Sequence, residues 1–128
     1  MKPFILSRIR SFGHAFLGWW HVIRTQQNAW VHSIVTVAVV IVGVWLGLSP
    51  RDWAILLITI AMVWAAEFFN TAIEAVVDLA SPDKHPLAKV GKDVGAAAVL
   101  IAALAAIGVG LLILGPPLWE RLAAVLEG

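Results

Sequence analysis

The sequence contains no cysteine and no tyrosine, and only 13% of its 128 residues are charged. Without cysteine, the chain has no disulfide, no thiolate metal ligand and no cysteine nucleophile. The scarcity of charge accompanies a hydrophobic fraction of 61% and a mean hydropathy of +0.91. This composition is typical of membrane proteins rather than soluble ones. The sequence therefore predicts a single-domain integral membrane protein, and its net charge of +1 gives no indication of nucleic-acid binding.

The common nucleotide-binding and transporter patterns are also missing. The glycine-rich stretch GVGLLILG lacks the Gly-Lys-Ser/Thr ending of a Walker A motif, and no kinase glycine-rich loop is present. We find no internal repeat of the kind that builds inverted-repeat transporters. Any nucleotide site must therefore be formed without a Walker A motif or a kinase glycine-rich loop.

Three apolar runs are each long enough to cross a hydrocarbon core of about 30 Å. They predict transmembrane helices over residues 30–48, 53–79 and 94–114. The connection around Pro50 is very short, so the first two helices are expected to run antiparallel. The predicted architecture is all-α, with three transmembrane helices.

Two segments flank the third predicted span. Residues 80–92 are expected to form a polar loop, because this stretch contains helix-breaking prolines and several charges. Gly115, Pro116 and Pro117 are expected to end the third helix. The remaining tail, residues 116–128, is assigned no chemistry.

The N-terminal segment, residues 1–24, is predicted to be an amphipathic helix on the membrane surface. Its apolar residues recur at steps of three and four, whereas its basic residues fall largely off that stripe. The stripe consists of Ile5, Ile9, Phe12, Phe16, Trp19 and Ile23. Packing of this helix against protein is an alternative that is compatible with contact to lipid.

The distribution of basic residues predicts the orientation of the chain. Most Lys and Arg residues lie in the N-terminal segment or in the loop at 80–92, whereas only Arg51 and Arg121 lie at the opposite surface. The positive-inside rule then places the N-terminus and that loop in the cytoplasm.

The second apolar run carries a polar stripe: Glu67, Asn70, Glu74 and Asp78. Spacings of three, four and four residues put these side chains on one face of a helix. An ionised group in hydrocarbon costs at least about 2.5 kcal/mol, so the stripe must face protein, water or a cation. Glu67 and Glu74 are about 10 Å apart along the helix axis, which favours separate roles over a shared proton.

The residues alone leave three functions open. Carboxylates, an asparagine and lysines at a membrane surface suit an enzyme that binds Mg²⁺ and phosphate. The same stripe suits an ion or proton pathway in a small oligomer. It also suits an accessory subunit whose buried charges pair with a larger partner.

The segments EFFNTAIEAVVD, SPDKHPLAK and KDVGAAAVLIAA resemble the prokaryotic diacylglycerol kinase family, which includes undecaprenol kinases. SPDKHPLAK and NAWVH are similar to the undecaprenol kinase branch. The resemblance implies a homotrimer of three-span subunits, each with a surface helix, and active sites shared between neighbouring subunits. It also implies ATP- and Mg²⁺-dependent phosphorylation of a lipid alcohol, diacylglycerol or undecaprenol, in the bacterial inner membrane.

The same resemblance assigns roles by position. Glu67 matches the catalytic carboxylate that activates the lipid hydroxyl, and Asn70 matches an asparagine that supports it. Glu74 matches a metal-binding glutamate. The residues matched to the nucleotide and its phosphates are Asp78, Asp83, His85, Lys92 and Asp93. Asp78 has a simpler alternative role, which is to pair with a lysine.

Two positions depart from the family pattern. Gln26 stands where family members often have a second metal-binding glutamate, and a neutral amide is a weaker Mg²⁺ ligand than a carboxylate. His14 stands where some members have a tyrosine. His32 is interpreted as an interface residue and is given no chemical role.

Overall fold

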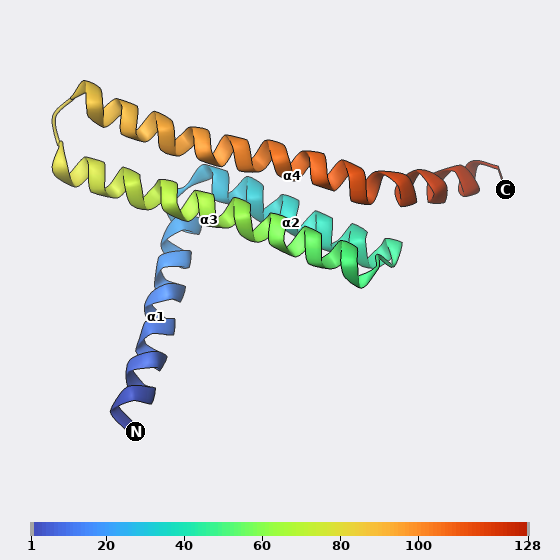
Figure 1. Cartoon of the computed structure of the whole chain (residues 1–128), viewed down its shortest axis with the longest axis horizontal. Helices are drawn as coiled ribbons and strands as arrows, with labels where there is room; N and C mark the ends of the chain where they lie inside the picture. The colour runs from blue at the N-terminus through green and yellow to red at the C-terminus, as the bar shows by residue number, and fades with distance from the viewer. Residues whose placement is uncertain (1, 128) are drawn as a thin grey trace.

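The computed structural model describes residues 2–127, and side chains from residue 7 onward. Within that part of the chain all regular structure is helical. The four helices are α1 (Lys2–Thr25), α2 (Gln27–Leu46), α3 (Pro50–Ala80) and α4 (Pro86–Leu126). Helices α2, α3 and α4 lie side by side, and α1 extends away from them, starting from the point where α2 begins (Figure 1).

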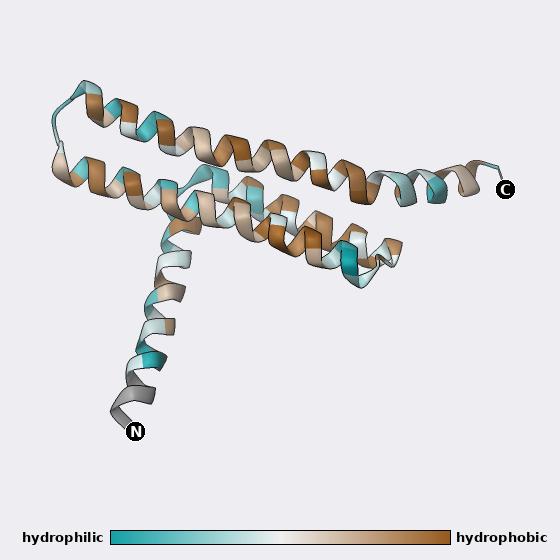
Figure 2. Cartoon of the chain, viewed as in Figure 1, coloured by the Kyte–Doolittle hydropathy of each residue, from teal (hydrophilic) through white to brown (hydrophobic). Residues whose placement is uncertain are grey.

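Three of the helices, α2, α3 and α4, are long and apolar enough to cross a membrane. Hydrophobic residues cover their lengths, whereas hydrophilic residues gather at helix ends and in the connection between α3 and α4 (Figure 2). The predicted fold class, three apolar spans preceded by an N-terminal helix, is confirmed.

The bundle buries few of its apolar side chains. Leu56, Val63 and Val99 are buried, but large residues such as Ile58 and Leu112 are more than 70% exposed. A soluble protein cannot leave so much apolar surface in water. In a bilayer that surface contacts lipid or other helices. The apolar side chains are then shielded from water without a large internal core.

The turn between α2 and α3 is tight and well capped. Gly47 adopts a left-handed conformation with φ of 69° at the C-terminus of α2, where a side chain would be strained. The Ser49 hydroxyl accepts a hydrogen bond from the backbone N–H of Asp52 and donates one to its carboxylate. These contacts begin α3 at Pro50 and fold it back antiparallel to α2.

Helix α4 differs from the prediction at both ends. It begins at Pro86, so part of the polar segment predicted as loop is helical. The ring Nδ1 of His85 accepts a hydrogen bond from the backbone N–H of Leu87 and caps the helix start.

The prediction that Gly115, Pro116 and Pro117 end the third helix is wrong. The helix continues through both prolines to Leu126. Proline removes a backbone donor but its fixed φ is compatible with helix, so two adjacent prolines weaken hydrogen bonding locally without ending the helix. The residues beyond them are therefore part of the helix, and Arg121 lies over the ring of Trp45 on α2.

Candidate active site

Four polar side chains of α3 are buried, and two of them, Glu67 and Asn70, belong to the polar stripe. Glu67 is 0% exposed and Asn70 is 5% exposed. Their backbone lies in a continuous helix, and the hydroxyl of Thr71 donates to the Glu67 carbonyl. Burying a carboxylate is costly unless it is paired or protonated, so Glu67 occupies a position that stability alone does not favour.

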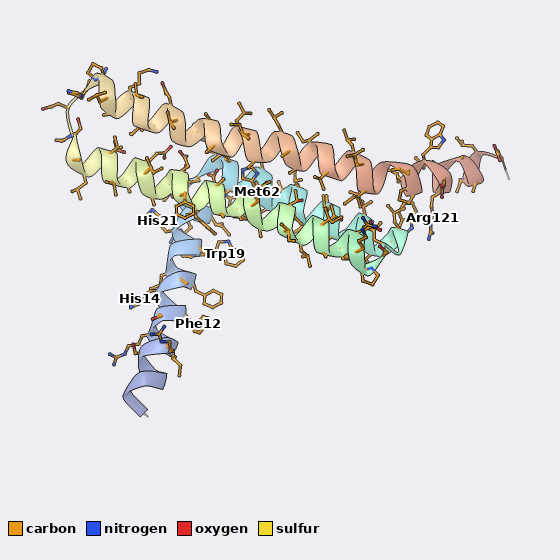
Figure 3. All side chains as sticks on the ribbon, in the orientation of Figure 1. Phe12, His14, Trp19, His21, Met62 and Arg121 are labelled. Carbon is orange, nitrogen blue, oxygen red and sulfur yellow. The ribbon has the colours of Figure 1, made fainter. Side chains whose placement is uncertain are left out.

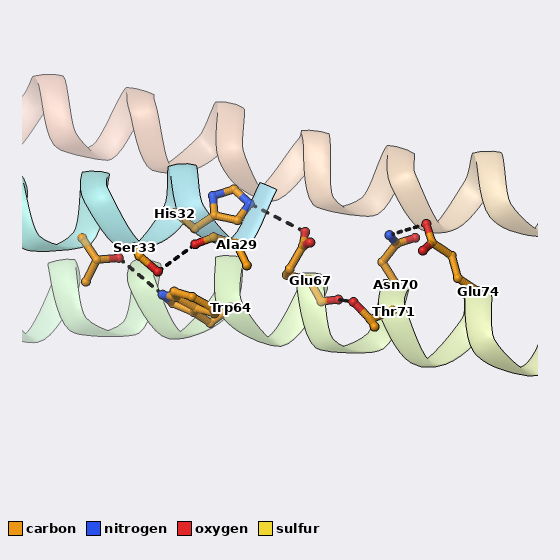
Figure 4. A network of polar contacts seen from close by, with 9 residues as sticks. Ala29, His32, Ser33, Trp64, Glu67, Asn70, Thr71 and Glu74 are labelled. Atoms are coloured by element: carbon orange, nitrogen blue, oxygen red, sulfur yellow. Dashed lines mark hydrogen bonds and ion pairs between the residues drawn. The ribbon is translucent and has the colours of Figure 1, made fainter. Parts of the chain in front are cut away.

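His32 on α2 faces the Glu67 carboxylate. Its Nε2 lies 3.7 Å from Glu67 Oε2, as the dashed line in Figure 4 shows. That distance is too long for a hydrogen bond but close enough for an ion pair. Within the described residues, both oxygens of Glu67 and the Nε2 of His32 are buried without a hydrogen-bond partner.

An aromatic network contacts this histidine through Trp64. The His32 ring packs edge-on against Trp64, with ring centroids 6.3 Å apart. The indole N–H of Trp64 donates to the Thr36 hydroxyl over 3.3 Å. Trp64 also packs edge-on against Trp19 of α1, with ring centroids 5.9 Å apart, so the network joins three helices.

Sequence reasoning gave His32 no role, although one signal was available. Between Thr25 and Pro50 the sequence has no Asp, Glu, Lys or Arg, and His32 is the only ionisable side chain there. An ionisable residue inside a predicted span is a candidate functional residue by default. Its proximity to Glu67 depends on how α2 and α3 pack, and no spacing rule gives that.

One helical turn beyond Asn70, the Glu74 carboxylate accepts hydrogen bonds from two side-chain amides. Gln26 donates from Nε2 to one oxygen over 3.3 Å, and Asn70 donates from Nδ2 to the other over 3.1 Å. Gln26 lies between α1 and α2, so residues 48 positions apart in the sequence meet here. We call Gln26, His32, Glu67, Asn70 and Glu74 the interhelix cluster.

Helix α4 approaches the cluster closely because residue 95 is glycine. A Cβ built on Gly95 would stand 2.4 Å from Asn70 Oδ1, closer than real Cβ contacts occur. Four residues earlier, a Cβ on Gly91 would meet Val77 at an ordinary 3.6 Å. The side chain of Asn70 thus occupies space that any other residue at position 95 would take.

The cluster suits a Mg²⁺ ion that keeps much of its coordination for phosphate and water. Glu74 provides carboxylate oxygens, and Asn70 Oδ1 is a buried acceptor without a hydrogen-bond partner. Such oxygen ligands are those that Mg²⁺ prefers. Among the described residues no group of three or more His, Cys, Asp or Glu side chains could enclose a metal, so the protein does not supply a full cage.

Toward the end of α3 a second polar site lies around the α3–α4 connection. A pocket of about 550 Å³ is lined by all five residues matched to the nucleotide: Asp78, Asp83, His85, Lys92 and Asp93. We call it the loop pocket. Asp78, at the near edge of this pocket, is eleven residues beyond Glu67 on α3. This corresponds to about 16 Å along the helix axis.

The charges of the loop pocket pair with one another. The Lys92 ammonium contacts the Asp78 carboxylate, and the Lys89 ammonium contacts that of Asp93. The simpler interpretation of Asp78, as the partner of a lysine, therefore describes its contact in this structure. The carboxylates of both pairs are more than half exposed, so each pair is worth little to stability and opens at small cost.

An apolar groove of about 550 Å³ runs between α1 and α3. Helix α1 contributes Phe12, Phe16 and Trp19, and α3 contributes Phe68 and Ala72. Phe12 and Trp19 project from one side of α1, whereas His14 projects from the other (Figure 3). His14, which stands where some family members have a tyrosine, does not line this groove.

Comparison with known proteins gives the relationship of this chain. The sequence profile of the prokaryotic diacylglycerol kinase family matches residues 13–114. An undecaprenol kinase from Bacillus subtilis is 41% identical over 109 residues, which cover 85% of this chain and 89% of that protein.

Proteins named diacylglycerol kinase are also similar. One from Synechocystis is 42% identical over 109 residues, or 84% of this chain, and the match spans 62% of that longer protein. One from Escherichia coli is 32% identical over 88 residues, covering 63% of this chain and 72% of its own. The chain therefore belongs to the prokaryotic diacylglycerol kinase family, whose members are lipid kinases of the membrane.

Proposed function

We propose that this protein transfers the γ-phosphate of MgATP to the hydroxyl of a membrane lipid alcohol, diacylglycerol or undecaprenol. The observation that carries the proposal is the Glu67 carboxylate, which is fully buried and has no hydrogen-bond partner among the described residues. A structural carboxylate at such a position is normally hydrogen-bonded. One that lacks a hydrogen-bond partner and directly precedes the groove residue Phe68 suits a general base that acts on a lipid hydroxyl.

The two sites divide the substrates by polarity. The loop pocket is charged and exposed, and it suits a nucleotide approaching from water. The groove between α1 and α3 is lined mainly by apolar side chains, and it suits the hydrocarbon of a lipid. Thr71 lines the groove and directly follows Asn70 in the sequence, so a hydroxyl at the groove's α3 edge lies near the interhelix cluster.

The residues then act in sequence. Glu67 accepts the proton of the lipid hydroxyl as its oxygen attacks the γ-phosphorus, while the bond from that phosphorus to the β,γ-bridging oxygen breaks and ADP leaves. Asn70 holds Glu74 through its amide, and Glu74 provides carboxylate oxygens for Mg²⁺. A bound Mg²⁺ supplies charge neutralisation on the phosphates. Lys92 leaves Asp78 to offset charge on the phosphates of the bound nucleotide.

Three further assignments belong to this proposal. By the positive-inside rule the loop pocket faces the cytoplasm, in the bacterial inner membrane. Residues 1–24 form the surface helix, and residues 30–48, 53–79 and 94–114 lie within the bilayer. The working form is a homotrimer with shared sites, which fits the many apolar side chains that one copy leaves exposed.

The test is an assay with radiolabelled ATP and purified protein in mixed micelles that contain either diacylglycerol or undecaprenol. We expect Mg²⁺-dependent transfer of label to one or both lipids. Comparing kcat/KM for the two lipids then assigns the preferred substrate, which identities of 41% and 42% to differently named relatives leave undecided.

A second arm separates this proposal from an ion or proton pathway. The same protein is placed in liposomes without ATP, and cation or proton flux is measured. Transfer of label without flux supports the kinase. Flux that is abolished by Glu67→Gln, with no lipid phosphorylation in micelles, would overturn it.

A further inference from the structure

A histidine that the proposed chemistry does not use stands beside the proposed base. His32 and Glu67 come from different helices, and their side chains are 13% and 0% exposed. The Nε2 of the ring lies nearest Glu67 Oε2, while Oε1 of the same carboxylate has no partner among the described residues. One oxygen of Glu67 therefore faces the histidine and the other is free.

We propose that His32 is a positioning residue for Glu67: its ring Nε2 holds one carboxylate oxygen so that the other is presented to the lipid hydroxyl. This inference rests on the proposed function, and it deepens it by assigning a residue that acts through the base. The gap of 3.7 Å closes to a hydrogen bond with a shift of less than about 1 Å. Catalytic hydrogen bonds are often long before substrate binds and tighten in the complex.

The surroundings of His32 fix its ring. Trp64 packs against one side of the ring, and the Trp64 indole is itself anchored to Thr36. Trp19 of α1 packs against Trp64, with ring centroids 5.9 Å apart. Because α1 also forms one wall of the apolar groove, lipid that seats in the groove contacts the same network that orients His32.

Few other polar groups compete for this contact. On α3 itself the nearest acidic side chain is Glu74, which is engaged by Gln26 and Asn70. On α4 the residue beside Asn70 is Gly95, which has no side chain. Among the described residues His32 is thus the polar group of another helix that faces Glu67.

The alternative is that His32 only fills space against Trp64. Three variants separate the two roles. H32F keeps a flat ring of similar size but has no nitrogen, whereas H32Q loses the ring and keeps an N–H donor at similar reach. S33A is the matched control, because the Ser33 hydroxyl bonds only to the Ala29 carbonyl of its own helix.

The experiment measures kcat and KM for ATP and for lipid in each variant. For H32F we expect kcat to fall about 10²-fold, the cost of misplacing a reacting group, with both KM values changed less than about threefold. H32Q should recover kcat to within about tenfold of the unmodified protein, because it restores the donor. S33A should match the unmodified protein.

A coupling measurement asks whether His32 acts through Glu67. In the E67Q background residue 67 accepts no proton, so adding H32F should lower the residual turnover less than about twofold, a strongly non-additive result. An equal loss in both backgrounds would mean that His32 acts independently, and the inference would be wrong. If H32F does not accumulate as folded protein, H32L takes its place as the apolar variant.

The outcomes also separate this inference from the proposed function. Phosphorylation of lipid by the unmodified chain together with full activity of H32F and loss in H32Q overturns the positioning role and leaves the kinase intact. Absence of lipid phosphorylation in the unmodified chain overturns both.

Discussion

The interhelix cluster and the loop pocket are both polar, yet they are built in opposite ways. In the cluster, Glu67 is 0% exposed and its carboxylate has no hydrogen-bond partner among the described residues. In the loop pocket, the Lys92–Asp78 and Lys89–Asp93 pairs satisfy their own charges in water. The interhelix cluster holds a carboxylate in an unfavourable environment. In the loop pocket, each charged group of these two pairs already has a partner of opposite charge when no ligand is bound.

This difference separates two kinds of contribution to the proposed reaction. A buried carboxylate is held in place by packing, and its burial costs free energy. Its substitution should therefore affect the chemical step. Exposed ion pairs are weak and easily exchanged for phosphate, so substitution there should affect binding of the nucleotide. The following predictions, from the largest expected effect to the smallest, test this division.

Glu67→Gln gives the strongest test of the interhelix cluster. The amide has nearly the same shape but cannot accept the hydroxyl proton, so kcat should fall about 10³-fold. KM for ATP should change little, because the loop pocket is distant. Lipid phosphorylation with radiolabelled ATP measures both. The control is Glu120→Gln on the exposed part of α4, and near-normal kcat in Glu67→Gln would refute the base assignment.

Gly95→Ala tests whether packing holds the cluster in position. The new Cβ would stand 2.4 Å from Asn70 Oδ1 and must displace that amide from Glu74. A displacement near 1 Å costs roughly 10²-fold in turnover. The matched control is Gly91→Ala, whose Cβ meets Val77 at 3.6 Å on the same helix. Equal activity of the two alanine variants would show that Asn70 need not be held tightly.

Lys92→Met tests the loop pocket. It removes the ammonium that contacts Asp78 and leaves that carboxylate facing the nucleotide phosphates. We expect KM for ATP to rise about tenfold, the cost of roughly one charge-assisted contact. Arg51→Met, a loss of charge at the opposite end of α3, is the control. A fall in kcat with unchanged KM would place Lys92 with the chemical step and break the comparison.

Gln26→Glu sharpens the metal assignment. The substitution replaces an amide donor at 3.3 Å from Glu74 with a second carboxylate, which repels Glu74 unless a cation lies between them. The Mg²⁺ concentration for half-maximal activity should fall roughly three- to tenfold, because ligand charge raises cation affinity. Gln27→Glu, the exposed neighbour, is the control. An unchanged Mg²⁺ requirement would mean that Gln26 lies outside the metal site.

The polar stripe of α3 shows how much of the site helical periodicity alone can predict. Spacings of three and four residues placed Glu67, Asn70 and Glu74 on one face of a helix, and the structure has them on one face of α3. The failure at Pro116 and Pro117 shows the limit of a local rule. Proline weakens a helix, but its φ permits continuation where the flanking residues favour helix.

By itself, the sequence determined the three apolar helices, the polar face of α3 and the family to which the chain belongs. These follow from hydrophobicity, helical period and motif, which are local. Only the tertiary structure decided that His32 faces Glu67, that Gln26 meets Glu74 and that Gly95 makes room for Asn70. Those contacts depend on the rotation and offset of one helix against another, which the packing of all their side chains sets together.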